Sequence, residues 1–162
     1  MGAPIGAPEE GQIVDDIEAI KQVKYRYLRA LDTKAWDDFE DTLTTDVTGE
    51  YGESLSFADR TTLVDFMRST VGPAVITEHR ADHPVITVNG DEATGEWYLQ
   101  DRVIVTEFKF MLFGAAFYSD RYRRTADGWK ICATGYKRTY EATLSLDDIP
   151  SFQCKPGAAL NL

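Results

Sequence analysis

The stretch VITEHRADHPVITVNGDEATGEWYLQDRVIVTEF, residues 75–108, decides the fold class of this 162-residue chain. Its runs of β-branched and aromatic residues are divided by Pro84 and by an Asn-Gly-Asp-Glu turn at residues 89–92. Similar runs follow at residues 111–125 and 128–142, on either side of a Thr-Ala-Asp-Gly turn. This half of the chain therefore predicts a long antiparallel meander of strands.

The residues before this stretch follow a helical period instead. Apolar side chains at steps of three, four and seven predict an amphipathic helix over residues 15–31: Ile13, Ile17, Ile20, Tyr27 and Leu31. A shorter helix is predicted over residues 34–43, and a third from an N-cap at Asp59 to Gly72, with a short strand pair at residues 47–57 between them. Helices first and strands last favour an α+β fold with the helices on one sheet face.

Composition limits the classes of function. The length and the 43% hydrophobic content fit one domain, which we place at residues 12–144 between a flexible N-terminus, residues 1–11, and an irregular tail, residues 145–162. A net charge of −10 disfavours nucleic acid and anionic membranes as partners. Because no secretory signal and no membrane-spanning apolar run is found, we expect a soluble cytoplasmic protein.

The two histidines of the chain, His79 and His83, stand four residues apart. On a helix such a pair can hold zinc, but Pro84 and the flanking β-branched runs predict a strand with His83 in extended conformation. Strand residues four apart are separated by about 13 Å, so we expect no shared metal ion.

Strand alternation indicates which of these side chains point inward. Thr77 and His79 fall on one face and the charged Glu78 and Arg80 on the other, so His79 should face the interior. A core histidine bonded to a backbone carbonyl is the alternative.

In the next strand, Asp101 stands within the apolar set. A buried carboxylate must be paired or hydrogen-bonded. Asp101 could therefore join His79 at a functional site or form an ion pair with Arg121, Arg123 or another strand arginine.

Three segments together resemble the SnoaL-like branch of the nuclear transport factor 2-like superfamily: YRYLRALDTKAWDDF (residues 25–39), TEHRADHPVITVNGDEATGEWY (residues 77–98) and GWKI (residues 128–131). The resemblance spans about residues 12–142 and implies a curved antiparallel sheet wrapped with three N-terminal helices into a cone-shaped barrel. The chain looks most like scytalone dehydratase, bile acid 7α-dehydratase and hexachlorocyclohexane dehydrochlorinase. Such enzymes eliminate water or HCl from a ring substrate without a cofactor, by means of a His–Asp pair.

The resemblance also implies site residues. The family aspartate at the end of the first helix matches Asp32, and its histidine near the start of a strand matches His79. A tyrosine or lysine five residues before the aspartate matches Tyr27, and a strand aspartate used in part of the branch matches Asp101. Where the family has an asparagine before the proline, this chain has His83, whose role stays open.

Elimination chemistry suits these residue types. An imidazole can take a proton near neutral pH, and a carboxylate fixes its tautomer and stabilises the imidazolium. Tyr27 could donate a hydrogen bond to developing charge, while Asp101 could act as a second acid or position a substrate hydroxyl. Two alternatives remain: Asp32 or Thr33 could instead cap the second helix, and Tyr25 could take the place of Tyr27.

We therefore expect a lyase, without cofactor or metal, acting on a hydrophobic cyclic small molecule. Seven apolar residues are candidates for the pocket lining: Phe66, Met67, Trp97, Leu99, Met111, Phe113 and Phe117. A ketosteroid-type isomerase, with Asp101 or Asp32 as base and Tyr27 as oxyanion donor, is a second possibility, and a non-catalytic ligand-binding or assembly module is a third. By analogy with the dehydratases we expect a homo-oligomer, a trimer rather than a dimer.

Overall fold

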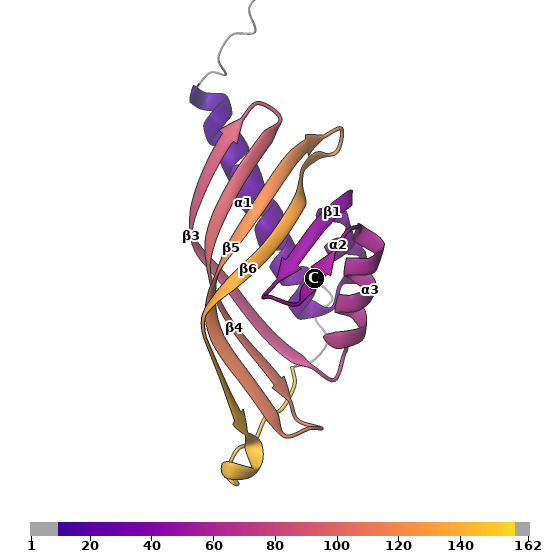
Figure 1. Cartoon of the computed structure of the whole chain (residues 1–162), viewed down its shortest axis with the longest axis vertical. Helices are drawn as coiled ribbons and strands as arrows, with labels where there is room; N and C mark the ends of the chain where they lie inside the picture. The colour runs from indigo at the N-terminus through magenta and orange to yellow at the C-terminus, as the bar shows by residue number, and fades with distance from the viewer. Residues whose placement is uncertain (1–9, 158–162) are drawn as a thin grey trace, which may run out of the picture.

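The computed structural model describes residues 10–157, in which three α-helices lie against one face of a long curved sheet (Figure 1). The element order is α1 (Glu10–Thr33), α2 (Trp36–Asp41), β1 (Leu43–Tyr51), β2 (Leu55–Phe57), α3 (Arg60–Thr70), β3 (Ile76–Asn89), β4 (Glu92–Val105), β5 (Phe110–Thr125), β6 (Gly128–Ser145) and the 3-10 helix η1 (Leu146–Asp148). The α+β class predicted from the sequence is confirmed.

The six strands form one open sheet in the order β2-β1-β6-β5-β4-β3. Strands β3 to β6 make the predicted antiparallel meander, but β1 lies parallel to β6. The outer strands β2 and β3 do not pair with each other, so the sheet is not closed into the expected cone-shaped barrel (Figure 1). β2 has only three residues, which offer few backbone groups for pairing beyond those that face β1.

Helix α1 extends beyond the predicted residues 15–31 at both ends. It ends in a Schellman motif, because the N–H of Lys34 donates to the Leu31 carbonyl (3.4 Å) and the N–H of Ala35 donates to the Ala30 carbonyl (2.9 Å). Lys34 occupies the left-handed position of this cap, with φ 62°.

Helix α2 is shorter than predicted because Lys34 and Ala35 belong to the end of α1. Its N-cap is Ala35, which makes no side-chain capping bond, so neither Asp32 nor Thr33 caps it. Helix α3, by contrast, has the predicted cap: the N–H of Thr62 donates to Asp59 Oδ1 at 2.8 Å.

Strand β3 joins two predicted runs through a bulge at His83. The register with β4 shifts between Asp82 and Val85, and His83 is exposed with φ 50°, so its predicted extended conformation is wrong. Pro84 has no N–H for the ladder, and the bulge takes this position out of regular pairing.

The chain ends are described only in part. Residues 1–9 of the predicted flexible N-terminus and residues 158–162 of the predicted tail lie outside the described residues, whereas residues 10 and 11 belong to α1. After β6, the chain forms η1 and then turns without regular structure to residue 157. No helix within residues 10–157 is long and apolar enough to cross a membrane.

Candidate active site

Asp32 and His79 meet between α1 and β3. The His79 ring nitrogen Nδ1 lies 2.7 Å from Asp32 Oδ1, and the backbone N–H of His79 donates to Asp32 Oδ2 at 2.9 Å. The side chains are 11% and 24% exposed, respectively. An ionised carboxylate accepts the Nδ1 proton, which leaves the Nε2 lone pair available to take a proton from a ligand.

The positions of these two residues follow from their elements. Asp32 stands in the last turn of α1, within the residues that the Schellman motif spans, and α1 packs against the inner face of the sheet. His79 pairs with Asp101 across β3 and β4, and both side chains share that inner face, as strand alternation predicted.

Asp101 is engaged by an arginine that the sequence alone did not single out. Arg138, from β6, donates two hydrogen bonds to the Asp101 carboxylate, one of them from Nη2 to Oδ2 at 2.7 Å. These bonds raise the pKa of the Arg138 guanidinium above its ordinary value. Arg138 Nε also lies 3.3 Å from Glu141 Oε2. The inward position of Asp101 is thus stabilised by a strand arginine, but neither Arg121 nor Arg123 is that partner.

Gly114 gives Arg138 its path to Asp101. The register between β5 and β6 shifts next to Ala115, and the Arg138 side chain then passes over Gly114. A Cβ at this glycine would lie 2.9 Å from Arg138 Nη1 and 2.6 Å from the Tyr140 carbonyl oxygen, so no larger residue fits without a shift.

Tyr27 is fully buried, whereas Tyr25 is exposed and contacts the edge of Trp97. The Tyr27 hydroxyl lies 2.7 Å from that of Tyr51, a β1 residue that the sequence analysis missed. Burial is the main cause that raises the pKa of both phenols. Both therefore stay protonated and can act only as neutral donors or acceptors.

An aromatic row connects this tyrosine pair to the Asp101 ion pair. The Tyr51 ring lies 5.4 Å from the ring of Tyr136, and the Arg138 guanidinium carbon lies 5.0 Å from the same Tyr136 ring. A continuous series of polar and aromatic side-chain contacts thereby joins α1, β1, β6 and β4.

A second ion pair, between Lys24 and Asp120, is more deeply buried than that of Arg138 and Asp101. Lys24 Nζ is 2.7 Å from Asp120 Oδ2, and both side chains have no exposed surface. Asp120 also accepts hydrogen bonds from Tyr122 (2.9 Å) and Thr134 (2.7 Å), and the Lys24 ammonium lies 3.3 Å from the centre of the Tyr118 ring. Burial lowers the pKa of Lys24, while Asp120 opposes that shift.

The apolar residues proposed for a pocket lining fall on two different faces. Trp97 and Leu99 are buried on the inner face with Asp101, and Phe66 and Met67 of α3 are partly buried against the same core. The other three lie on the outer face, since their β4 partners alternate with Asp101: Met111, Phe113 and Phe117. One cavity therefore cannot be lined by all seven, because a strand places successive side chains on opposite faces.

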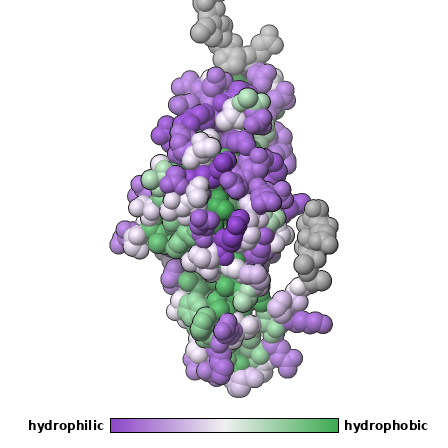
Figure 2. Space-filling model, turned by 90° about the vertical axis from the view of Figure 1, so that its right-hand side faces the viewer, coloured by the Kyte–Doolittle hydropathy of each residue, from purple (hydrophilic) through white to green (hydrophobic). Residues whose placement is uncertain are grey.

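Other apolar side chains continue the inner face beyond Asp101. Val103 pairs with Leu112, and both are half-buried, as is Val105 at the end of β4. Figure 2 shows the helix side of the molecule, with apolar surface gathered in the lower part of the view, where these strands extend past the helices. The His79–Asp32 pair is thus followed along the sheet by an apolar surface.

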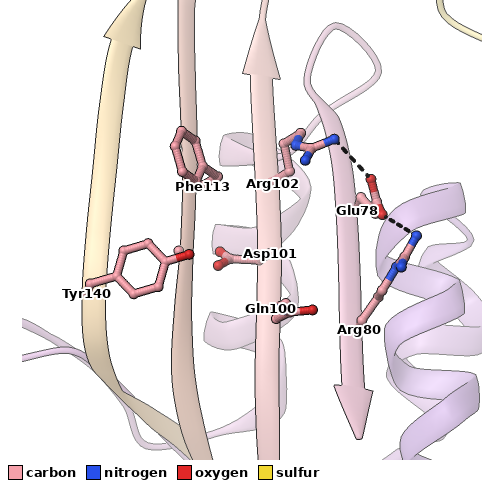
Figure 3. A pocket seen from close by; sticks show the side chains of 8 residues that line it. Glu78, Arg80, Gln100, Asp101, Arg102, Phe113 and Tyr140 are labelled. Carbon is pink, nitrogen blue, oxygen red and sulfur yellow. Dashed lines mark ion pairs between the residues drawn. The ribbon is translucent and has the colours of Figure 1, made fainter.

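A different pocket, of about 320 Å³, lies mainly on the outer face (Figure 3). The Glu78 carboxylate stands there between the guanidinium groups of Arg80 (2.8 Å) and Arg102 (3.8 Å), which share it. Neither His79 nor Asp32 lines this pocket. We therefore take the inner face as the candidate site, since the His79 imidazole contacts Asp32 there and lies opposite Asp101 on the neighbouring strand.

Metal ligands do not gather at these residues. Within residues 10–157, no group of three or more His, Cys, Asp or Glu side chains could hold a metal ion. His83 is exposed on its bulge, apart from the inner-face cluster.

Comparisons with known proteins agree with this architecture. A putative scytalone dehydratase from Novosphingobium aromaticivorans superposes with a TM-score of 0.77 at 15% identity, over 83% of this chain and 91% of that chain. A hexachlorocyclohexane dehydrochlorinase from Novosphingobium barchaimii gives 0.77 at 16% identity, over 92% and 100%. A protein from Kribbella flavida gives 0.75 at 21% identity, over 80% and 95%. At these identities the likeness establishes the fold.

The sequence itself matches the SnoaL-like domain family over residues 12–134. That range contains all of α1 except its first two residues, and it includes Asp32, the His79 strand β3 and Asp101. The family match, together with neighbours named as a dehydratase and a dehydrochlorinase, supports a family that processes small molecules. The chain therefore belongs to the SnoaL-like branch of the nuclear transport factor 2-like superfamily.

Proposed function

We propose that this protein is a cofactor-independent lyase that eliminates water or a hydrogen halide from a hydrophobic cyclic small molecule. The observation that carries the proposal is the double contact of Asp32 with the ring Nδ1 and the backbone N–H of His79. The backbone N–H orients the carboxylate, and the carboxylate in turn fixes the rotation and the tautomer of the imidazole through Nδ1, which a general base requires.

The elimination then balances as follows. His79 Nε2 takes a proton from a ring carbon, and the electrons of that C–H bond form the new double bond. The leaving group departs from the neighbouring carbon with its bonding electrons, as chloride or as hydroxide. A departing hydroxide requires a proton, which the imidazolium can supply while a neutral phenol donates a hydrogen bond to the leaving oxygen. Asp32 stabilises the imidazolium while it exists.

The other polar residues support this reaction in distinct ways. In the Tyr27–Tyr51 pair one hydroxyl donates to the other, so the accepting hydroxyl keeps a proton for a substrate oxygen. Asp101 is held by two hydrogen bonds from Arg138, and we propose that it orients this guanidinium and a substrate hydroxyl.

The proposed substrate class rests on the surface beside the dyad. Val103, Val105 and Leu112 offer the imidazole an apolar neighbour, which suits a ring with few polar groups. Two structural neighbours are named as a dehydratase and a dehydrochlorinase, and both names describe eliminations.

A panel of cyclic alcohols, ketones and chlorides tests the proposal by chromatographic detection of the unsaturated product. We expect at least one compound to be turned over, and His79→Gln and Asp32→Asn to lower that rate by about 10²- to 10⁴-fold. His83→Gln is the matched control, since this exposed histidine lies outside the cluster. Turnover that survives in His79→Gln contradicts the proposed base.

A non-catalytic ligand-binding module is the second candidate, because many of the buried charges are already paired with one another. Lys24 pairs with Asp120 and Arg138 with Asp101. In such a module the same panel binds without being changed, and His79→Gln alters affinity alone. An isomerase with Asp32 or Asp101 as base has less support, because hydrogen-bond donors already engage both carboxylates.

A further inference from the structure

A lysine beside the dyad is held in a conformation that favours other residues. Lys34 is the left-handed residue of the α1 cap, a position where glycine or asparagine is usual and a side chain with a Cβ is strained. Its side chain crosses from the helix end to the sheet, where Nζ donates to Thr77 Oγ1 at 2.8 Å. The helix cap alone therefore does not explain why a lysine occupies this position.

The hydrogen bond places this ammonium next to the proposed base. Thr77 and His79 are two residues apart on β3 and share the inner face, which separates them by about 6–7 Å along the strand. Val103 lies directly opposite Thr77 on β4. Lys34 is therefore positioned where the polar site passes into the apolar surface.

The Lys34 ammonium is not paired with a carboxylate among residues 10–157. Both Asp32 oxygens are used by His79, and Lys34 forms no salt bridge within 4.0 Å among the described residues. Arg138, the other cation of the site, is held by Asp101 and Glu141. An ammonium has three donors, and Thr77 takes one of them.

The partial burial of the Lys34 ammonium strengthens its binding of an anionic ligand. Lys34 is half-buried, and burial lowers its pKa while Asp32 partly restores it. A charged donor in a partly desolvated position binds an anionic oxygen more strongly than the same donor in water. A chain with net charge −10 repels anions in general, so a local cation is the means by which it could select one.

We propose that Lys34 is a specificity-determining residue that binds a carboxylate on the cyclic substrate of the His79–Asp32 site. This inference rests on the proposed function for the location of the substrate and adds to it the substrate class, cyclic carboxylic acids. The ring lies on the apolar surface near Val103, with the reacting carbon at His79 and the carboxylate at Lys34.

Paired probes test the inference without any need for turnover. 2-Naphthoate and 2-naphthamide have the same ring system and differ in charge, and neither has a leaving group. Titration of each into the protein near neutral pH, followed by the His79 ring signals in NMR, measures both dissociation constants. We expect the wild type to bind the carboxylate about tenfold or more tightly than the amide.

The variants separate loss of charge from loss of fold. Lys34→Gly removes the ammonium and places glycine at the left-handed position, so the cap is retained and the preference should vanish. Lys34→Arg should keep most of the preference. Lys109→Gly is the matched control, because Lys109 also has a positive φ (49°) but stands in the β4–β5 turn and pairs with Asp147.

Three results overturn the inference: equal affinities in the wild type, a preference that persists in Lys34→Gly, or no binding of either probe. Its failure is distinguishable from failure of the lyase. A Lys34-dependent preference without elimination of any compound refutes the lyase and retains the carboxylate site. Suppose instead that neutral and acidic substrates are both eliminated and that the ratio of their KM values is the same in Lys34→Gly as in the wild type. That result refutes the carboxylate site and retains the lyase.

Discussion

At the scale of single residues, Lys24 shows how a charge can be kept inside an apolar helix face. It stands in the inward row of α1 between Ile20 and Tyr27, a feature visible in the sequence. Asp120 supplies the opposite charge, and the face of the Tyr118 ring covers the ammonium. Asp120 lies in a distant strand, and only the folded register of β5 brings it to Lys24, so the sequence could not identify the pair.

Removal of one partner from this pair should cost much more than removal of both charges. Lys24→Met leaves the Asp120 carboxylate buried without its cation, and we expect the free energy of unfolding to fall by about 3–5 kcal/mol. The double variant Lys24→Met/Asp120→Asn should recover a large part of that loss. Urea unfolding of both variants measures the difference, and an equal loss in the two would show that the charge of Asp120 is not the cause.

At the scale of elements, strand alternation predicted some of the site and failed for the rest. It placed His79 and Asp101 inward correctly, because β3 and β4 pair in continuous register through both residues. It did not assign Phe113 or Phe117 to the outer face, since an aromatic residue suits either face of a sheet. The contact between Asp32 and His79 followed from family resemblance, and alternation alone could not have found it.

The passage of Arg138 over Gly114 gives an element-scale prediction. Gly114→Ala should force Arg138 and the Tyr140 backbone to shift, with a loss of stability of about 1–3 kcal/mol and a fall in turnover as the Asp101 contact weakens. Gly11→Ala is the control, because its added methyl group meets nothing within 4 Å on α1. Urea unfolding and the elimination assay measure both effects. Wild-type turnover in Gly114→Ala would mean that the Arg138–Asp101 geometry is not needed.

At the scale of the whole molecule, α1 is attached to the sheet at both of its ends. Near its N-terminus, Asp16 accepts hydrogen bonds from Arg124 (2.7 and 2.9 Å) and from the indole N–H of Trp129 (3.1 Å). Near its C-terminus, Asp32 contacts His79. The contact that we propose to be catalytic is therefore also a polar attachment that helps to fix the position of the helix on the sheet.

The contact of Asp16 with Arg124 should make the free energy of unfolding depend on pH in the acidic range. The hydrogen bonds from Arg124 are the main cause that lowers the pKa of Asp16 below its ordinary value. The stabilisation is therefore complete above the unfolded pKa of about 4 and is lost as the pH falls through the lower folded pKa. We expect Asp16→Asn to cost about 1–3 kcal/mol at neutral pH and progressively less below about pH 4.

Chemical denaturation across that pH range checks the expectation. Asp91→Asn is the matched control: its carboxylate binds the same Arg124 but is largely exposed, so we expect a loss of about 1 kcal/mol or less at neutral pH. A cost of Asp16→Asn that stays constant into acid would indicate a steric effect in place of a charge effect.

The bulge at His83 has a consequence for the behaviour of the protein in concentrated solution. β3 is an edge strand, and an edge with a regular row of free N–H and C=O groups is a template on which another chain can add a strand and aggregate. Here the row is interrupted by His83 and Pro84, and Glu78, Arg80 and Asp82 place charges along it. The strand that carries the proposed base is thus also an edge strand, and its bulge and its charged side chains oppose the addition of a further chain.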